Sequence, residues 1–230
     1  MLMLALVPFV LSATAPEVDV RVVGALRSVV REGKTDGLAR LSALNVNKTT
    51  VGLGALAALD GEATILHGDI HLSRPRNGKA VASSGDAEVC LFVMADVPEW
   101  GSVRLSEGVT WAKLDRAIED TLRRQGLDTA KRIPFLLEGE FRNLNAHVVD
   151  GSKLPKGPSS HEQHIETAVQ FASPKTKGTI VGFFSKSDLG VFTHHTTTTH
   201  LHCVLPAEGF SGHVDEVALS AGTTLRFPKP

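Results

Sequence analysis

The feature that most constrains the fold is a pair of strand-like segments that carries three histidines, His200, His202 and His213. The first two lie two residues apart in a run of Thr, Leu, Cys and Val, a composition typical of a β-strand. Side chains two apart on a strand leave the same face. His213 follows a connection that contains Pro206 and Gly209. A second strand that returns beside the first would therefore bring a third imidazole next to the other two.

Three imidazoles that converge from adjacent strands would form an open metal site. Zinc is its natural occupant, with the remaining coordination position left for water or substrate. The alternative is a polar strand without a ligand, because His-x-His pairs arise by chance and a threonine run precedes this one. The metal site is favoured because His213 is followed by an apolar, strand-like segment that contains Val214, Val217 and Leu219.

Composition limits the class of protein. The chain has 230 residues, of which 42% are hydrophobic, which is enough to build a packed core. A net charge of −1, the absence of tyrosine and the small number of aromatic residues argue against a nucleic-acid partner. We therefore expect a small-molecule ligand.

The N-terminus is an apolar run that ends in small residues. It is too short to span a bilayer comfortably and resembles the apolar part of a signal peptide, although no Lys or Arg precedes it. We expect residues 1–15 to be a signal peptide, residues 16–230 to form one domain, and the protein to be exported rather than held in a membrane. The alternative is a buried first strand.

The two cysteines, Cys90 and Cys203, allow two interpretations. In an exported protein they could form one disulfide, but the sequence does not show that they lie close together. Cys203 alternates with His202, so its side chain should leave the opposite face of the strand. We therefore expect Cys203 to be a small core residue and not a metal ligand.

The remaining pattern predicts an α+β fold with a mixed, largely antiparallel sheet and a few helices. The clearest helix covers 110–126, with Thr110 able to cap its start, an apolar stripe at helical spacing and Gly126 as its terminator. Other expected elements are a strand and short amphipathic segment over 19–33, a hairpin over 63–72, a polar loop over 74–88, a buried strand over 89–97, a strand pair over 133–149, a loop over 151–160, a short helix over 162–171 and a buried strand over 178–184.

Several of these segments resemble bacterial α-acetolactate decarboxylases and occur in the family's order. The segments cover 22–34, 52–72, 134–149, 177–185 and 200–214, and the most specific are LDGE at 59–62 and the HLH-x10-H spacing. The resemblance implies a barrel-like α+β domain, a possible homodimer and zinc-dependent decarboxylation of 2-acetolactate to acetoin. It places the zinc on His200, His202 and His213.

The resemblance also places a catalytic glutamate on Glu62, beside the metal. A carboxyl group there could deliver the proton that the product needs after carbon dioxide leaves. The alternative is a solvent-facing turn glutamate, which is common after an Asp-Gly pair.

The chain departs from the family at three points. His147 stands where the family has an active-site arginine, and a histidine cannot grip a carboxylate as a guanidinium fork does. Ala55 replaces a family threonine, and no obvious equivalent of a second, C-terminal glutamate precedes Pro230. If His147 points into the pocket, it could act as an acid, an oxyanion donor or an additional ligand. The neighbouring His194 and His195 are expected to be surface-loop histidines.

Three functions therefore remain open. The first is a zinc-dependent decarboxylase acting on acetolactate or a related small 2-hydroxy-3-oxo acid. The second is a zinc-dependent hydrolase or lyase on the same scaffold, with Glu62 or His147 as base. The third is a non-catalytic metal-binding module, against which the absence of an obvious fourth protein ligand argues.

Overall fold

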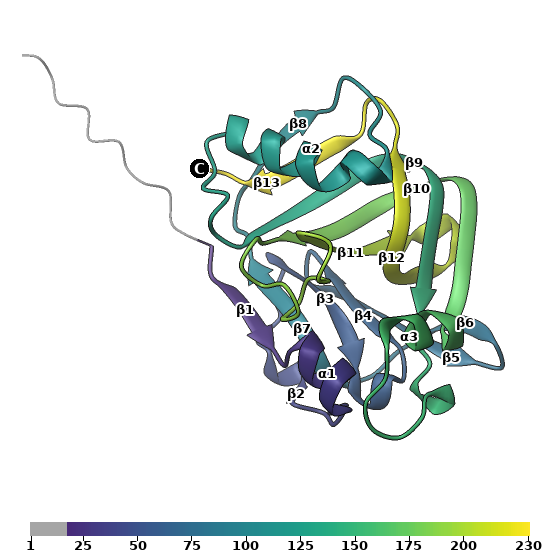
Figure 1. Cartoon of the computed structure of the whole chain (residues 1–230). Coiled ribbons are helices and arrows are strands. Elements are labelled where there is room, and N and C mark those ends of the chain that lie inside the picture. The colour runs from purple at the N-terminus through teal and green to yellow at the C-terminus, as the bar shows by residue number, and fades with distance from the viewer. Residues whose placement is uncertain (1–17) are drawn as a thin grey trace, which may run out of the picture.

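The computed structural model describes residues 18–230, which form two antiparallel sheets and three α-helices (Figure 1). The first sheet has the order β1-β7-β3-β4-β5-β6, with the short β2 also paired to β7. Its strands are β1 Val20–Val23, β2 Ala39–Arg40, β3 Thr50–Leu56, β4 Glu62–Leu66, β5 Asp69–Arg76, β6 Lys79–Ser83 and β7 Glu88–Asp96.

The second sheet has the order β10-β11-β12-β9-β13-β8 and curls into a barrel-like ring. Because β10 also pairs with β9, the path through β9, β10, β11 and β12 returns to its starting strand. The expected largely antiparallel, barrel-like fold is confirmed. The strands of this sheet are β8 Trp100–Arg104, β9 Ile133–Val148, β10 Val169–Phe184, β11 Thr199–Leu205, β12 Phe210–Leu219 and β13 Thr224–Pro228.

The central strand β7 shows how the sequence fills both faces of the first sheet. Phe92 and Met94 pack with β4 and β5 on one face, whereas Val93 and Ala95 pack on the other. The second set meets Val181 and other apolar side chains of the second sheet. A continuous apolar run is what a strand covered on both faces requires.

The three helices are α1 Leu26–Glu32, α2 Trp111–Arg124 and α3 His161–Thr167. The apolar stripe of α2 packs on the second sheet as predicted, with Leu114, Ile118 and Leu122 fully buried. Thr110 precedes α2 but makes no side-chain cap, whereas Ser160 and Gln163 form a capping box on α3. None of the helices in the described part of the chain is long and apolar enough to cross a bilayer.

The expected loop at 74–88 is wrong for residues 74–83. β5 continues to Arg76 and returns as β6 through a two-residue turn at Asn77 and Gly78. Both turn residues have positive φ, 53° and 74°, as tight hairpin turns with an Asn-Gly pair require. The Asn77-Gly78 pair is a sequence signal for a hairpin. The sequence was still interpreted as a loop, because the residues of the edge strand β6 and its neighbourhood are largely polar.

Two further expectations need correction. Residues 133–149 form the single strand β9 and not a strand pair, because β10 pairs with it continuously in register from one end to the other. The helix expected over 162–171 ends at Thr167, and Val169 already begins β10. The other expected strands and the hairpin joining β4 and β5 are confirmed.

Cys90 and Cys203 are both buried free thiols. They belong to different core clusters, so the disulfide interpretation is wrong and Cys203 is the small core residue that its strand position predicts. The expected signal peptide, residues 1–15, lies outside the described residues.

Candidate metal centre

The three histidines meet on β11 and β12, as the sequence predicts. His202 and His213 are direct partners in the antiparallel ladder, and His200 lies two residues before His202 on the same face. One ligand atom from each ring lies within 4.8 Å of the others. His200 Nε2 and His213 Nδ1 are 3.1 Å apart. Two nitrogens bound to one tetrahedral zinc would lie about 3.3 Å apart, so the spacing suits a shared ion.

The chemistry of the three rings also suits a metal ion. Burial lowers the pKa of His200 to about 4 and holds the pKa values of His202 and His213 well below the ordinary value. The rings are therefore neutral near pH 7, with a lone pair available for coordination. His202 Nδ1 lies 3.0 Å from Thr64 Oγ1, while its buried Nε2 has no hydrogen-bond partner among the described residues. A metal ion would satisfy that nitrogen.

Glu62 is not a solvent-facing turn residue. It begins β4, is only 5% exposed, and its Oε2 lies 3.7 Å from His202 Nε2. Burial raises its pKa well above the ordinary value; a hydrogen bond from the Val149 backbone opposes this effect, and the charge of Asp215 adds to it. The carboxyl group is therefore protonated at a higher pH than an exposed glutamate, which suits a proton donor.

His147 reaches the same site from β9. It is the ladder partner of His213, and the two ring centroids are 4.9 Å apart. Its Nδ1 lies 2.8 Å from an oxygen of Asp215. This bond fixes the ring and leaves Nε2 as the nitrogen that can meet a ligand. Asp215 is a residue that the sequence analysis missed, although it lies two positions after His213 on a strand and therefore shares its face.

A cavity of about 350 Å³ opens beside these residues. Glu62, His147, Asp215, His200 and His213 line it, together with apolar side chains. None of its lining residues is a lysine or an arginine. The apolar lining comprises Leu26, Val29, Ala55, Leu59, Leu91, Trp111, Val149, Ile165, Phe192, Leu201 and Val214.

Three more histidines, His161, His164 and His194, line the cavity. His161 of α3 and His194 of the segment before β11 have ring centroids 4.1 Å apart, and both line the cavity. The expectation that His194 is an ordinary surface residue is therefore wrong, whereas His195 is exposed as expected. Sequence spacing gave no signal for this contact, because it joins segments more than thirty residues apart.

Comparison with known proteins finds one matching family and several solved structures with the same fold. The sequence model of the family described as alpha-acetolactate decarboxylase matches residues 24–227. No curated protein matches the chain by sequence. The fold matches α-acetolactate decarboxylase from Bacillus subtilis strain 168 with a TM-score of 0.68 and 19% identity, over 92% of this chain and 86% of that chain.

Two other solved structures share the fold. Acetolactate decarboxylase from Bacillus subtilis subspecies spizizenii gives a TM-score of 0.70 and 20% identity, over 92% of this chain and 86% of that one. A Staphylococcus aureus protein of unknown function, described as similar to α-acetolactate decarboxylase, gives a TM-score of 0.69 and 16% identity, over 90% of this chain and 84% of that chain.

Proposed function

The chain belongs to the α-acetolactate decarboxylase family, and from this premise we propose that it is a zinc-dependent carboxy-lyase. Its substrate would be 2-acetolactate or a closely related small 2-hydroxy-3-oxo acid, and the product from acetolactate would be acetoin. The observation that carries the proposal is the histidine triplet with the carboxyl group of Glu62 beside it, at a cavity that His200, His213 and Glu62 line.

His200, His202 and His213 would hold the zinc ion. When bound, zinc supplies Lewis acidity toward the hydroxyl and carbonyl oxygens of the substrate. Three histidine ligands leave a coordination position for such oxygens, as catalytic zinc sites do. Thr64 fixes the orientation of the His202 ring through its contact with Nδ1, so that Nε2 faces the ion.

Glu62 would carry the proton transfer. The bond between the carboxylate carbon and the carbinol carbon breaks, carbon dioxide leaves, and the electron pair passes toward the neighbouring carbonyl oxygen. The carbinol carbon must then gain a proton. Burial raises the pKa of Glu62 well above the ordinary value, which favours the protonated carboxyl group that could donate this proton from one face and regain one from solvent.

His147, held by Asp215, would stand in the place of the family's arginine and bind the substrate carboxylate. With Nδ1 committed to Asp215, a protonated ring offers one N–H from Nε2, where a guanidinium fork offers two. The cavity lining contains no other basic side chain except histidines. We therefore expect weaker binding of the anionic substrate than an arginine would give.

The same His147–Asp215 pair favours a second candidate function. A neutral imidazole held by a carboxylate is the usual arrangement of a general base, and it could activate a water molecule for hydrolysis of a small ester or lactone. The cavity is large enough for such a molecule.

One experiment separates the two candidates. The full chain, loaded with zinc, is given racemic acetolactate in one reaction and small esters and lactones in another. The decarboxylase proposal predicts equal amounts of acetoin and carbon dioxide, lost with a chelator and restored by zinc. Ester or lactone turnover without acetoin would reject it in favour of the hydrolase.

A further inference from the structure

The turn that leads into Glu62 has an unusual backbone. Residues 57–61 connect β3 to β4, and within them Ala58 and Leu59 have φ values of 56° and 52°. Residues with a Cβ rarely adopt this left-handed conformation, and two in succession are costly unless surrounding contacts hold them. Gly61 has a φ of 120°, and a Cβ there would lie 2.1 Å from the Ser73 carbonyl oxygen. The chain is therefore forced into one path directly before Glu62.

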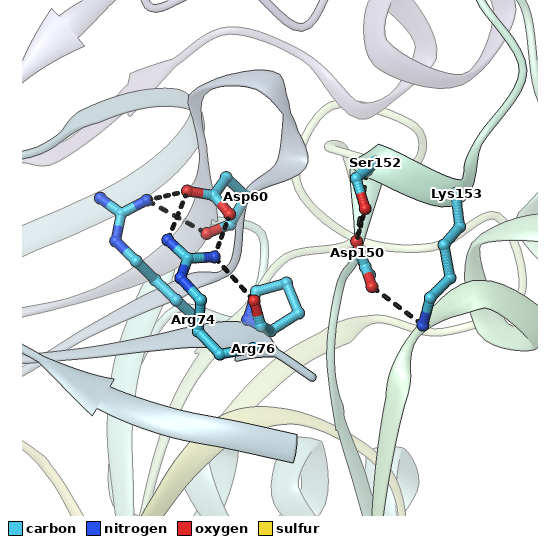
Figure 2. Close-up of polar contacts among 7 residues, drawn as sticks. Asp60, Arg74, Arg76, Asp150, Ser152 and Lys153 are labelled. Atoms are coloured by element: carbon cyan, nitrogen blue, oxygen red, sulfur yellow. Dashed lines mark hydrogen bonds and ion pairs between the residues drawn. The ribbon is translucent and has the colours of Figure 1, made fainter. Parts of the chain in front are cut away.

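Asp60 holds this turn from outside the cavity. Its carboxylate accepts hydrogen bonds from Arg74 and Arg76, which both lie on β5 (Figure 2). Arg76 uses both terminal nitrogens, at 2.8 and 3.3 Å, and Arg74 also donates to the Asp60 carbonyl oxygen at 3.3 Å. Hydrogen bonding by Arg76, followed by the charges of both arginines, lowers the pKa of Asp60 against the opposing effect of burial.

A second set of contacts supports the other side of the turn. Asp150 accepts hydrogen bonds from the backbone and hydroxyl of Ser152 and pairs with Lys153 (Figure 2). These bonds fix the short 3₁₀ turn at Gly151–Lys153, where a Cβ on Gly151 would lie 2.1 Å from the Ala58 carbonyl oxygen. Val149, whose backbone bonds Glu62, immediately precedes Asp150.

We propose that Asp60, gripped by Arg74 and Arg76, is a positioning residue that keeps the carboxyl group of Glu62 aimed into the cavity. The inference rests on the proposed function, because it assigns Asp60 a part in the same reaction. Only one residue, Gly61, separates Asp60 from Glu62, so release of the carboxylate lets the strained turn relax and moves Glu62. A displacement of about 1 Å can cost about a hundredfold in rate.

A purely structural ion pair makes a different prediction. Exposed ion pairs contribute little to stability, and the side chains of Asp60 and Arg76 are 39% and 52% exposed. If these contacts are surface ion pairs that do not affect the position of Glu62, loss of Asp60 should leave kcat unchanged. If they position Glu62, kcat should fall by much more than KM changes, and zinc content should stay the same, because the three histidines lie on β11 and β12 and not on this turn.

The test compares Asp60→Asn, Asp60→Glu and the control Glu138→Gln. Glu138 forms one ion pair of similar exposure with Arg226, on the second sheet and outside the cavity lining. We expect Asp60→Asn to lower kcat for acetoin formation about tenfold to a hundredfold with KM within about twofold of wild type. Asp60→Glu, which keeps the charge, should recover part of that loss, and the control should match wild type. Equal kcat values for Asp60→Asn and the control would overturn the proposal.

Amide hydrogen exchange over residues 57–62 gives a readout that does not depend on activity. Exchange there should be faster in Asp60→Asn than in wild type and unchanged in Glu138→Gln. Unchanged exchange in Asp60→Asn would contradict the proposal that Asp60 holds the turn. If Asp60→Asn does not fold, Arg76→Gln replaces it, with the same expected changes at a smaller size. A wild-type protein that forms no acetoin would reject the proposed function, and the exchange result would still decide whether Asp60 holds the turn.

Discussion

The histidine triplet and the Glu62 turn face the same cavity, but the fold positions them in different ways. His202 and His213 are paired residues in a regular ladder, and backbone hydrogen bonds along β11 and β12 set their spacing. Glu62 follows a turn with two positive-φ residues, and within that turn the side chain of Asp60 is bonded to Arg74 and Arg76 of β5. The ladder should therefore tolerate changes around it, whereas the position of Glu62 should depend on individual side chains.

Loss of a ladder histidine should have the largest effect. His202→Ala removes a buried imidazole whose Nε2 has no hydrogen-bond partner within residues 18–230, and the two remaining histidines cannot hold zinc tightly. We expect zinc content near zero and acetoin formation reduced on the order of a thousandfold or more. Metal analysis and a product assay check this. The exposed His195→Ala is the matched control and should keep both; retention of zinc by His202→Ala would remove the triplet from the metal centre.

Glu62→Gln should separate the two regions most clearly. The amide keeps the size of the side chain but cannot supply the acidic proton, so kcat should fall by about a hundredfold to ten-thousandfold. Zinc content should stay at the wild-type level, because the histidines are held by β11 and β12. Steady-state kinetics and metal analysis on the same preparation decide the matter. Full activity in Glu62→Gln would show that another group delivers the proton.

His147→Arg should have a smaller effect, in the direction of tighter substrate binding. The guanidinium can pair with Asp215 and still present a donor to the substrate carboxylate. We expect KM for acetolactate to fall by about threefold to tenfold, consistent with one added charge-assisted hydrogen bond. His147→Gln, which cannot carry charge, should raise KM. A higher KM in His147→Arg would mean that His147 has a role that an arginine cannot take over.

The smallest expected effect tests whether the ladder keeps its geometry when its surroundings weaken. Asp188 follows β10 and accepts two hydrogen bonds from Arg132 and one from Ser185. Burial acts to raise the pKa of Asp188, but these hydrogen bonds and the charge of Arg132 outweigh it and lower the pKa. Asp188→Asn should reduce the free energy of unfolding by about 1–3 kcal/mol at pH 7. Zinc content should not change.

The contribution of Asp188 to the free energy of unfolding should depend on pH, because its pKa is lowered in the folded protein. A lowered pKa in the folded state means that the ionised carboxylate stabilises the fold above the unfolded pKa of about 3.9. That contribution is lost as pH falls through the folded value. Urea denaturation of wild type and Asp188→Asn should therefore show a difference in the free energy of unfolding at pH 7, and this difference should become smaller below about pH 4. A difference that becomes larger in acid would contradict the stabilising role of the ionised Asp188 carboxylate.

The sequence predicted the histidine cluster well because its signal is periodic. Alternation on a strand fixes which side chains share a face, so His200 and His202 could be placed without any knowledge of the rest of the chain. The return of β12 beside β11 followed from the turn residues between them. The stripe of α2 and the core position of Cys203 were found by the same kind of pattern.

The parts that the sequence did not predict depend on contacts between distant segments. The ring contact between His161 and His194 joins α3 to the segment before β11, and no spacing rule connects them. The continuous strand β9 was mistaken for a pair because its exposed middle residues look like a turn, although β10 pairs along its whole length. The hydrogen bonds from Arg74 and Arg76 to Asp60 were not predicted, because the polar residues near the end of β5 resemble a loop in the sequence.

The most direct test of the central claim is a zinc titration of the metal-stripped full chain, with acetoin formation from racemic acetolactate measured at each step. We predict that the rate rises with added zinc and levels off at about one ion per chain, as a single open three-histidine site requires. Zinc that binds at that ratio without acetoin formation would contradict it, as would acetoin formation that is independent of zinc.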